Sequence, residues 1–147
     1  PESEYIKRVN EVKRLIEEMP DCEDVKFLEG RYNPNEFYDC AKGLEDAPEG
    51  GERCLKCFRL RLRETAKAAA KAGSEYVCTT LTISPLKNAD NLNKIGEEEC
   101  EKLGLKWLPS DFKKKNGYKR SIELSREYDL FRQNYCGCVF SKRNSVV

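Results

Sequence analysis

Four of the eight cysteines stand in two close pairs whose spacing could support thiol chemistry, and the chain contains no histidine. Cys54 and Cys57 form a CxxC motif, and Cys136 and Cys138 flank Gly137 in a CxC motif. Paired thiolates can bind a metal ion or cluster, or can cycle between a dithiol and a disulfide. The isolated cysteines, which we interpret as ordinary small apolar residues, are Cys22, Cys40, Cys78 and Cys100.

The CxxC motif is expected at the start of a helix, because Phe58, Leu62 and Ala66 follow it at helical spacing. The free N–H groups and the positive end of the helix dipole favour thiolates at such a position. Two sulfurs at this spacing can share one metal or cluster, but they do not complete a tetrahedral site. A metal-free, thioredoxin-like dithiol and a purely structural role are the alternatives.

In the CxC motif, Gly137 allows a tight bend in which both sulfurs point the same way. If oxidised, Cys136 and Cys138 would form a small strained disulfide that is easily reduced. If reduced, they could chelate one metal ion, and a neighbouring Arg132 or Lys142 would favour the thiolate in either case. The structural alternative is two buried small residues beside a glycine.

The residues alone leave the identity of a bound metal open. Zinc ribbons usually place their pairs about 15–20 residues apart, whereas about eighty positions separate Cys57 from Cys136. Iron–sulfur ligation tolerates scattered cysteines if the fold gathers them. Without histidine, His-ligated metal and a His general base are excluded, so a carboxylate, Tyr, Lys, Cys or water must transfer protons.

A basic loop that contains aromatic residues precedes the CxC motif and suggests a polyanionic partner. Residues 1–57 carry 9 basic and 15 acidic side chains, whereas residues 106–143 carry 10 basic and 4 acidic ones. Basic residues among aromatic rings suit a nucleic-acid strand, since phosphates bind cations and bases stack on rings. A solvated lysine-rich loop is the alternative. The candidate residues are Lys113, Lys114, Lys115, Lys119 and Arg120, with Tyr118 and Phe112.

The elements that position these residues are expected to form one α/β domain over residues 1–147, with a parallel sheet and crossover helices. Helices are expected over 3–19, over a short part of 33–53, from Cys54 to Gly73, from Asn88 or Asp90 to Gly104, and near 119–128. Strands are expected over 25–30, 75–81 and 105–109. Such a sheet places its chemistry in the loops that follow the strands.

No apolar stretch approaches the roughly 18 residues of a membrane span, and no secretory signal is visible. From these features we expect a cytoplasmic protein without a membrane partner.

Four blocks of the sequence, in order, resemble the QueH type of epoxyqueuosine reductase. They read KGLEDAPEGGERCLKCFRLRLRETA, TTLTISPLKNADNLNKIG, DFKKKNGYKRSIELS and FRQNYCGCVFSKR. The resemblance covers essentially the whole chain and implies a Rossmann-like α/β fold, similar to the adenine-nucleotide hydrolases. It also implies the activity, the last step of queuosine biosynthesis. In that step the epoxide oxygen of epoxyqueuosine is removed by a two-electron reduction, without cobalamin, at the wobble position of tRNAs with a GUN anticodon.

The resemblance also implies roles for individual residues. Cys54 and Cys57 match the family's CxxC, whose thiolates are ligands of a 4Fe–4S cluster. Cys136 and Cys138 match its CxC, a redox-active pair near the cluster that either cycles as a disulfide or holds an additional iron or other metal ion. An electron donor, which the sequence does not identify, supplies the electrons.

Further residues are expected to bind the substrate or to supply protons. The implied substrate-binding residues are Lys113, Lys114, Lys115, Lys119, Arg120 and Arg132. Asp111 and Tyr118 are the candidates for protonating the departing oxygen.

One departure from the family pattern concerns the beginning of the chain. Family members carry adjacent cysteines on a first strand, upstream of the proline at which this chain starts. We therefore expect that a strand with further cluster ligands is missing here, because Cys54 and Cys57 alone cannot hold a cubane cluster. Two other classes stay open, a zinc-stabilised RNA-binding module without catalysis and a metal-free thiol–disulfide oxidoreductase.

Overall fold

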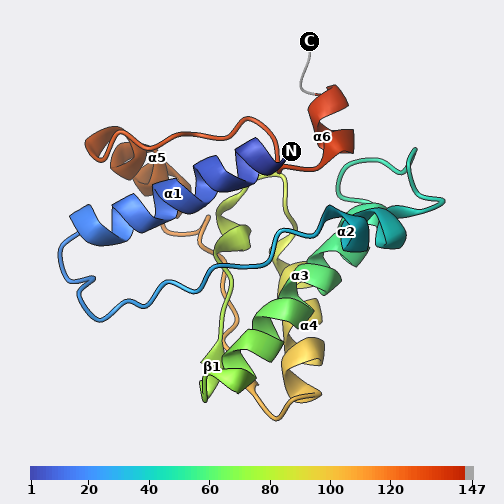
Figure 1. Ribbon diagram of the computed structural model, residues 1–147, viewed down its shortest axis with the longest axis horizontal. Helices are drawn as coiled ribbons and strands as arrows, with labels where there is room; N and C mark the ends of the chain where they lie inside the picture. Colours follow the sequence, from blue (N-terminus) through green and yellow to red (C-terminus); the bar gives the residue numbers. More distant parts are fainter. Residues whose placement is uncertain (145–147) are drawn as a thin grey trace. The chain divides into compact units, whose positions relative to one another are not determined.

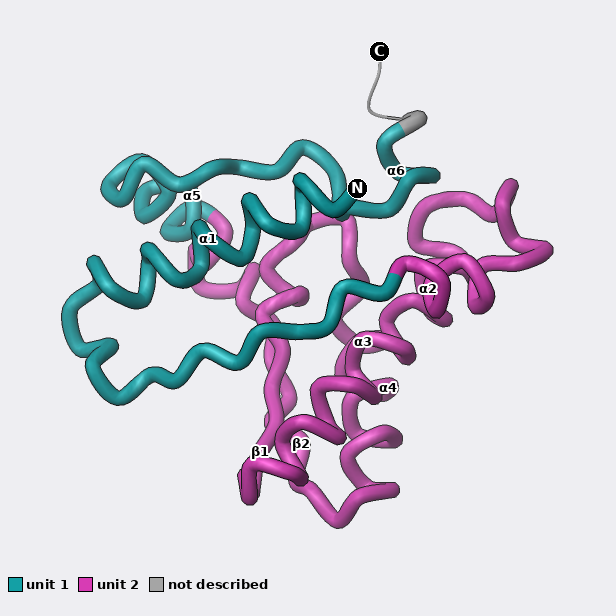
Figure 2. Tube along the Cα trace, viewed as in Figure 1, with its two compact units in different colours: residues 1–33, 119–147 teal, residues 34–118 magenta. Residues whose placement is uncertain are grey.

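The computed structural model describes residues 1–144, with side chains through Lys142, as a helix-rich chain with one small sheet (Figure 1). The chain forms two compact units (Figure 2). The first unit consists of Pro1–Asn33 and the segment that begins at Lys119, and the second consists of Pro34–Tyr118. A single domain over the whole chain stays a prediction.

The second unit is built on two packed helices, α3 (Glu52–Lys71) and α4 (Ala89–Glu101), which lie side by side in Figure 1. Phe58 and Leu62 of α3 meet Leu92 and Ile95 of α4 in one apolar cluster. A second cluster joins Ala66, Val77 and Cys100. The helical spacing of the buried residues predicts this face of α3, and the short helix α2 (Pro34–Ala41) packs on the same helix.

The sheet of the second unit consists of two parallel strands, β1 (Tyr76–Val77) and β2 (Lys106–Trp107). The Lys106 N–H donates to the Glu75 carbonyl at 3.0 Å, and the Leu108 N–H donates to the Val77 carbonyl at 2.9 Å. Helix α4 connects the strands, and parallel strands require such a crossover. The α/β class predicted from the alternation of elements is therefore confirmed at this level.

Three predicted strands differ from the structure. Residues 25–30 form no strand, and the side chain of Leu28 in this stretch is 71% exposed. The strand expected over 75–81 ends at Val77, because the Thr79 hydroxyl accepts a hydrogen bond from the Leu81 N–H at 3.2 Å and begins the 3₁₀ helix η1 (Thr80–Ile83). The strand expected over 105–109 is confined to Lys106–Trp107. Among the described residues the sheet thus has two strands instead of three.

Helix caps and the remaining helices follow the sequence more closely. The Asn88 side chain caps α4 by accepting from the Asn91 N–H at 2.9 Å, which resolves the choice between Asn88 and Asp90. In the first unit, α1 spans Glu2–Glu18, and α5 spans Gly117–Glu127 with its first two residues in the second unit. A further helix that the sequence did not lead us to expect, α6, spans Val139–Asn144. No helix within the described residues is long and apolar enough to cross a bilayer.

Candidate functional site

The CxxC motif lies in the first two turns of α3, as the sequence predicts. The helix begins at Glu52, after the N-cap residue Gly51. Cys54 and Cys57 are three positions apart and therefore lie on neighbouring parts of one helix face. Both side chains are partly buried, and Cys54 contacts the apolar cluster of α3 and α4. The core of the second unit thus holds this end of the helix in place.

Arg53, between the glycines and the CxxC motif, anchors the loop that leads into the helix. Its side chain is buried, and its Nη1 donates hydrogen bonds to the carbonyls of Leu44, Glu45 and Ala47 at 3.0, 2.9 and 2.7 Å. The loop thereby folds back over the helix start, and the Gly50 N–H reaches the Cys54 sulfur at 3.3 Å. Hydrogen bonds from backbone N–H groups to sulfur are among the means by which proteins adjust thiolate and cluster chemistry.

The donor set at this site fits part of a thiolate-ligated centre. Two sulfurs from one helix suit zinc or an iron–sulfur cluster, both of which require four ligands in their closed forms. Within residues 1–144, no three Cys, Asp or Glu side chains are grouped closely enough to hold a metal ion. Cys54 and Cys57 can therefore supply two ligands of such a centre, and the described residues around them do not supply the rest.

The four isolated cysteines have different environments. Cys100 is buried in the core, where desolvation raises the pKa of its thiol and keeps it protonated. Cys22 and Cys40 are partly buried, whereas Cys78 is exposed directly after β1. The interpretation as an apolar packing residue therefore fits Cys100 best and does not fit Cys78. All eight cysteines lie in the described part of the chain, as thiols and not as disulfides.

The CxC motif forms a turn that is held by α1. Arg8 donates from Nη1 to the Cys136 carbonyl at 3.1 Å and from Nη2 to the Tyr135 carbonyl at 3.2 Å. Gly137 has φ +100°, in a region that disfavours side chains, and a Cβ built there would lie 2.9 Å from Arg8 Nη1. Helix α6 follows at once, with the Lys142 N–H donating to the Cys138 carbonyl. The positive φ of this turn therefore favours glycine, and a side chain there would displace the guanidinium of Arg8.

The loops that follow the two strands meet through a network of polar side chains. The Asn93 side chain of α4 binds both backbone groups of Ser110: its Oδ1 accepts from the Ser110 N–H at 3.0 Å, and its Nδ2 donates to the Ser110 carbonyl at 2.9 Å. The Ser110 hydroxyl donates to the Thr79 carbonyl at 3.0 Å and lies 3.2 Å from the Thr82 hydroxyl. This network places Asp111, the next residue, at the carboxyl edge of the sheet, where parallel sheets carry their chemistry.

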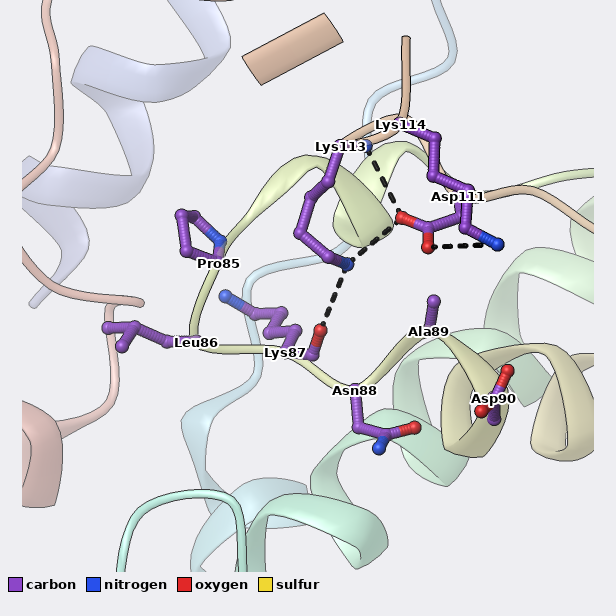
Figure 3. Close-up of a pocket in the computed structure, with 9 residues that line it drawn as sticks. All are labelled: Pro85, Leu86, Lys87, Asn88, Ala89, Asp90, Asp111, Lys113 and Lys114. Atoms are coloured by element: carbon purple, nitrogen blue, oxygen red, sulfur yellow. Dashed lines mark hydrogen bonds and ion pairs between the residues drawn. The ribbon is translucent and has the colours of Figure 1, made fainter. Parts of the chain in front are cut away.

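Asp111 and Lys113 line a pocket beside the start of α4 (Figure 3). The Lys113 ammonium lies 3.1 Å from the Asp111 carboxylate and donates to the carbonyls of Thr82 and Lys87. Its hydrogen bond lowers the pKa of the Asp111 carboxyl below its ordinary value. Asp111 is therefore ionised at neutral pH, and Lys113 is occupied by partners inside the protein.

The other predicted basic residues are more exposed. The Lys114 side chain is 78% exposed and lies 3.9 Å from Asp111, and Lys115 and Lys119 are exposed as well. Arg120 forms ion pairs with glutamates of α5, and Arg132 donates to the Ser125 hydroxyl at 2.9 Å. Lys114, Lys115 and Lys119 are therefore the members of the set with cations most accessible to a polyanion.

The predicted site residues are divided between the two units. Cys54, Cys57, Asp111, Lys113, Lys114, Lys115 and Tyr118 belong to the second unit. Lys119, Arg120, Arg132, Cys136 and Cys138 belong to the first. Within the second unit, ion pairs join Asp111 to Lys113 and to Lys114. The Tyr118 side chain is 39% exposed.

Two arginines at these sites have no part in the predictions from sequence. Arg53 stands next to a predicted ligand, two positions after a pair of adjacent glycines, so its position is a signal that could have been used. Arg8 lies 128 positions before Cys136, and nothing local to α1 indicates its role.

The described chain thus presents two close cysteine pairs, one in each unit, with the small two-stranded sheet in the second. The family model described as Epoxyqueuosine reductase QueH matches residues 1–144. The chain therefore belongs to the QueH epoxyqueuosine reductase family, as its sequence blocks predict.

Curated relatives agree with the family match. The chain is 44% identical over 145 residues to an Epoxyqueuosine reductase QueH of Streptococcus pyogenes serotype M1, and the match covers 97% of the chain and 57% of the relative. A relative of the same name from Staphylococcus epidermidis is 43% identical, with 96% and 61% covered. Another from Thermotoga maritima is 37% identical, with 96% and 73% covered. The chain thus spans about three-fifths of the length of the first two relatives.

Proposed function

We propose that the protein of which this chain is part reduces epoxyqueuosine to queuosine at the wobble position of tRNAs with a GUN anticodon. The observation that supports this proposal most directly is the family match over residues 1–144, because it includes both cysteine pairs and the basic loop. The reaction takes two electrons and two protons: the epoxide carbon–oxygen bonds break, an alkene forms and the oxygen leaves as water. The proposal implies a cytoplasmic location, where tRNA is modified.

Cys54 and Cys57 are proposed as two ligands of a 4Fe–4S cluster. The remaining ligands would come from a segment that corresponds to the part of the relatives outside the match. When bound, the cluster would supply the electrons for the reduction, which it would receive from an electron donor that is still to be identified. The soft sulfur donors and the Gly50 N–H bonded to the Cys54 sulfur support this role. The two-stranded sheet would then belong to a larger, Rossmann-like sheet.

Cys136 and Cys138 are proposed as the second thiol centre of the reaction. They would act as a dithiol that is oxidised to a disulfide while giving up two electrons and two protons, or they would bind an additional iron or other metal ion. The hydrogen bonds from Arg8 to the carbonyls of Tyr135 and Cys136 support a turn that is set before substrate binds. Such preorganisation lowers the cost of reaching a reactive geometry.

The departing oxygen requires protons, for which Asp111 and Tyr118 stay the proposed sources. The lowered pKa of Asp111 favours Tyr118 as the group that gives up a proton, with Asp111 accepting hydrogen bonds and orienting Lys113. Lys113, Lys114, Lys115, Lys119, Arg120 and Arg132 are proposed to bind tRNA phosphates. Among them, the exposure of Lys114, Lys115 and Lys119 gives these three the strongest support.

The test is an anaerobic assay with the full-length protein and tRNA that carries epoxyqueuosine. Nucleoside mass spectrometry should detect the loss of one oxygen atom, and the protein should be brown from iron–sulfur absorption. Cys54→Ser should lose both the colour and the product, whereas Cys22→Ser, in a partly buried cysteine outside both pairs, should keep them.

Other outcomes would point to other functions. A colourless protein that binds one zinc ion and tRNA but gives no product would favour the RNA-binding module. Reduction of protein disulfides by a metal-free protein would favour the thiol–disulfide oxidoreductase. Full product formation by Cys54→Ser would contradict the proposed ligand.

A further inference from the structure

We propose that Arg8 is a positioning residue that holds the CGC turn, so that Cys136 and Cys138 present their sulfurs as a pair to one common centre. The inference rests on the proposed function only where it assigns these thiols to the reaction. The contacts that carry it lie entirely within the first unit.

The guanidinium of Arg8 is held between Glu4 of its own helix and two backbone carbonyls of the turn. On α1 itself, Glu4 accepts a hydrogen bond from Arg8 Nε at 2.9 Å and forms an ion pair with Nη2 at 2.8 Å. The two Nη groups donate to the carbonyls of Cys136 and Tyr135, so Nη2 contacts both Glu4 and the turn. Because the planar fork of arginine binds two acceptors in a fixed geometry, it sets the orientation of two consecutive peptide groups.

The turn itself requires this arrangement. Gly137 adopts φ +100°, and any side chain there would come within 2.9 Å of Arg8 Nη1. The guanidinium also lies 5.4 Å from the centre of the Tyr135 ring, at a distance typical of a cation–π contact. The backbone at Cys136 and Gly137 is therefore packed against the cation, which restrains the bend between the two cysteines.

Further hydrogen bonds along α1 hold residues 128–136, the segment that leads to the CGC turn, in a fixed position beside the helix. Arg14 donates to the carbonyls of Tyr128 and Asp129 at 3.0 and 3.1 Å. Glu11 accepts from the Phe131 N–H at 2.8 Å. Arg8 follows at the same helical spacing and binds the turn, so the segment runs antiparallel to α1. A matched control is thus available in Arg14, which binds two carbonyls of the same segment away from the cysteines.

The probe is phenylarsine oxide, whose arsenic binds two thiol sulfurs at once. Two S–H bonds and the arsenic–oxygen bond break, two arsenic–sulfur bonds form and one water leaves, so no oxidant or reductant is needed. The probe is applied to residues 1–147 carrying Cys54→Ser and Cys57→Ser, in which Cys136 and Cys138 are the only close pair. Intact-mass spectrometry and competition with a small dithiol give the affinity.

We expect Arg8→Met to weaken arsenical binding roughly tenfold, the equivalent of about 1.4 kcal/mol. Gly137→Ala should weaken it as well, because φ +100° disfavours a side chain and the Cβ would lie 2.9 Å from Arg8 Nη1. Arg8→Lys keeps the charge but cannot bind both carbonyls in one plane, so it should recover little of the loss. Arg14→Met should stay within about twofold of the parent protein, since its carbonyl partners lie seven or more positions before Cys136.

Three results would overturn the inference. They are arsenical binding by Arg8→Met that equals the parent, full recovery by Arg8→Lys, and an equal loss in Arg14→Met. The first removes the role of Arg8, the second assigns the effect to charge instead of geometry, and the third assigns it to a general loosening of the unit.

A second measurement avoids the cysteine substitutions. Hydrogen exchange of the otherwise unaltered protein should rise in the peptide that contains the CGC turn and the start of α6 in Arg8→Met, but not in Arg14→Met. Unchanged exchange in that peptide would count against the inference. If the arsenical and exchange results agree with it while Cys136→Ser still reduces epoxyqueuosine, the positioning by Arg8 stands and the proposed role of the pair in the reaction is refuted.

Discussion

Replacing Glu99 with glutamine should destabilise the second unit at neutral pH, because Glu99 is the buried anion that joins α3 to α4. Its side chain is 2% exposed, and its carboxylate receives three cations: Arg59 at 2.8 Å, Lys102 at 2.6 Å and Arg63 at 3.2 Å. Burial opposes ionisation of this carboxyl, but the hydrogen bonds from the cations outweigh it and lower the pKa from 4.5 to about 2.

The size of the effect follows from the pKa. A lowering by roughly 2.5 units corresponds to about 3 kcal/mol at 1.36 kcal/mol per unit. The three cationic side chains are 36–57% exposed, so solvent screens them. We therefore expect Glu99→Gln to reduce the free energy of unfolding by about 1–2 kcal/mol.

The pH dependence gives the sharper test. Because the pKa of Glu99 is lower in the folded state than in the unfolded state, its stabilisation is complete above about pH 5.5 and is lost as the pH falls through 4.5 toward 2. The difference between the parent protein and Glu99→Gln should shrink over this range. Urea unfolding at several pH values, followed by fluorescence of the single tryptophan, Trp107 of β2, reports on this unit.

The matched control is Glu98→Gln. Glu98 is the adjacent residue, is 39% exposed and pairs with Arg59 alone at 2.7 Å. The Glu98→Gln substitution should reduce the free energy of unfolding by less than about 0.5 kcal/mol. Equal costs for the two substitutions, or a difference that grows in acid, would refute the assignment of Glu99 as the buried anion of the interface between the helices.

Two further substitutions test the packing of α4 and the basic loop. Gly96→Ala should lower the free energy of unfolding by about 1–3 kcal/mol, although alanine favours helices, because its Cβ would overlap the Trp107 ring. Thermal unfolding followed by circular dichroism measures the change. The control is Gly30→Ala, whose Cβ meets nothing within 4 Å. Stability of Gly96→Ala equal to that of the parent would contradict this packing. Replacing Lys114 and Lys115 with glutamate should weaken tRNA binding about tenfold or more and flatten its dependence on salt, whereas Lys71→Glu should not. Binding of tRNA is titrated at several salt concentrations for both variants. If Lys71→Glu weakens binding as much as the double replacement does, the basic loop is not part of the tRNA interface.

The parts of the fold that could be predicted are those that local sequence specifies. The buried residues of α3 repeat at helical spacing, and Asn88 can cap α4 without help from distant residues. The strands were harder, because a strand exists only where a partner accepts its hydrogen bonds. Residues 25–30 are apolar enough for a strand but have no such partner among the described residues. At Thr79, a hydrogen bond from its own side chain ends the strand early.

The candidate site divides in the same way. Cys54 could be placed at a helix start because the signal lies in the helix that follows it. The conformation of the turn at Cys136 could not be predicted beyond the bend at Gly137, since the side chain that binds the Cys136 carbonyl is that of Arg8, at the other end of the sequence. A glycine between two cysteines indicates a tight bend, but it does not identify the side chain that packs against that bend.

The pattern along α1 shows how such a contact could be found from a sequence. Arg14, Glu11 and Arg8 are spaced by three, and they bind positions near 128, 131 and 135. Each step of three along the helix is matched by a step of about three to four along the C-terminal segment, in the opposite direction. A charged stripe on a helix that otherwise buries nothing is usually taken as a solvated face. Here the same stripe binds backbone groups, which make no demand on the sequence of the partner segment. The charges of α1 therefore specify where the cysteine turn lies, and that information cannot be read from the turn itself.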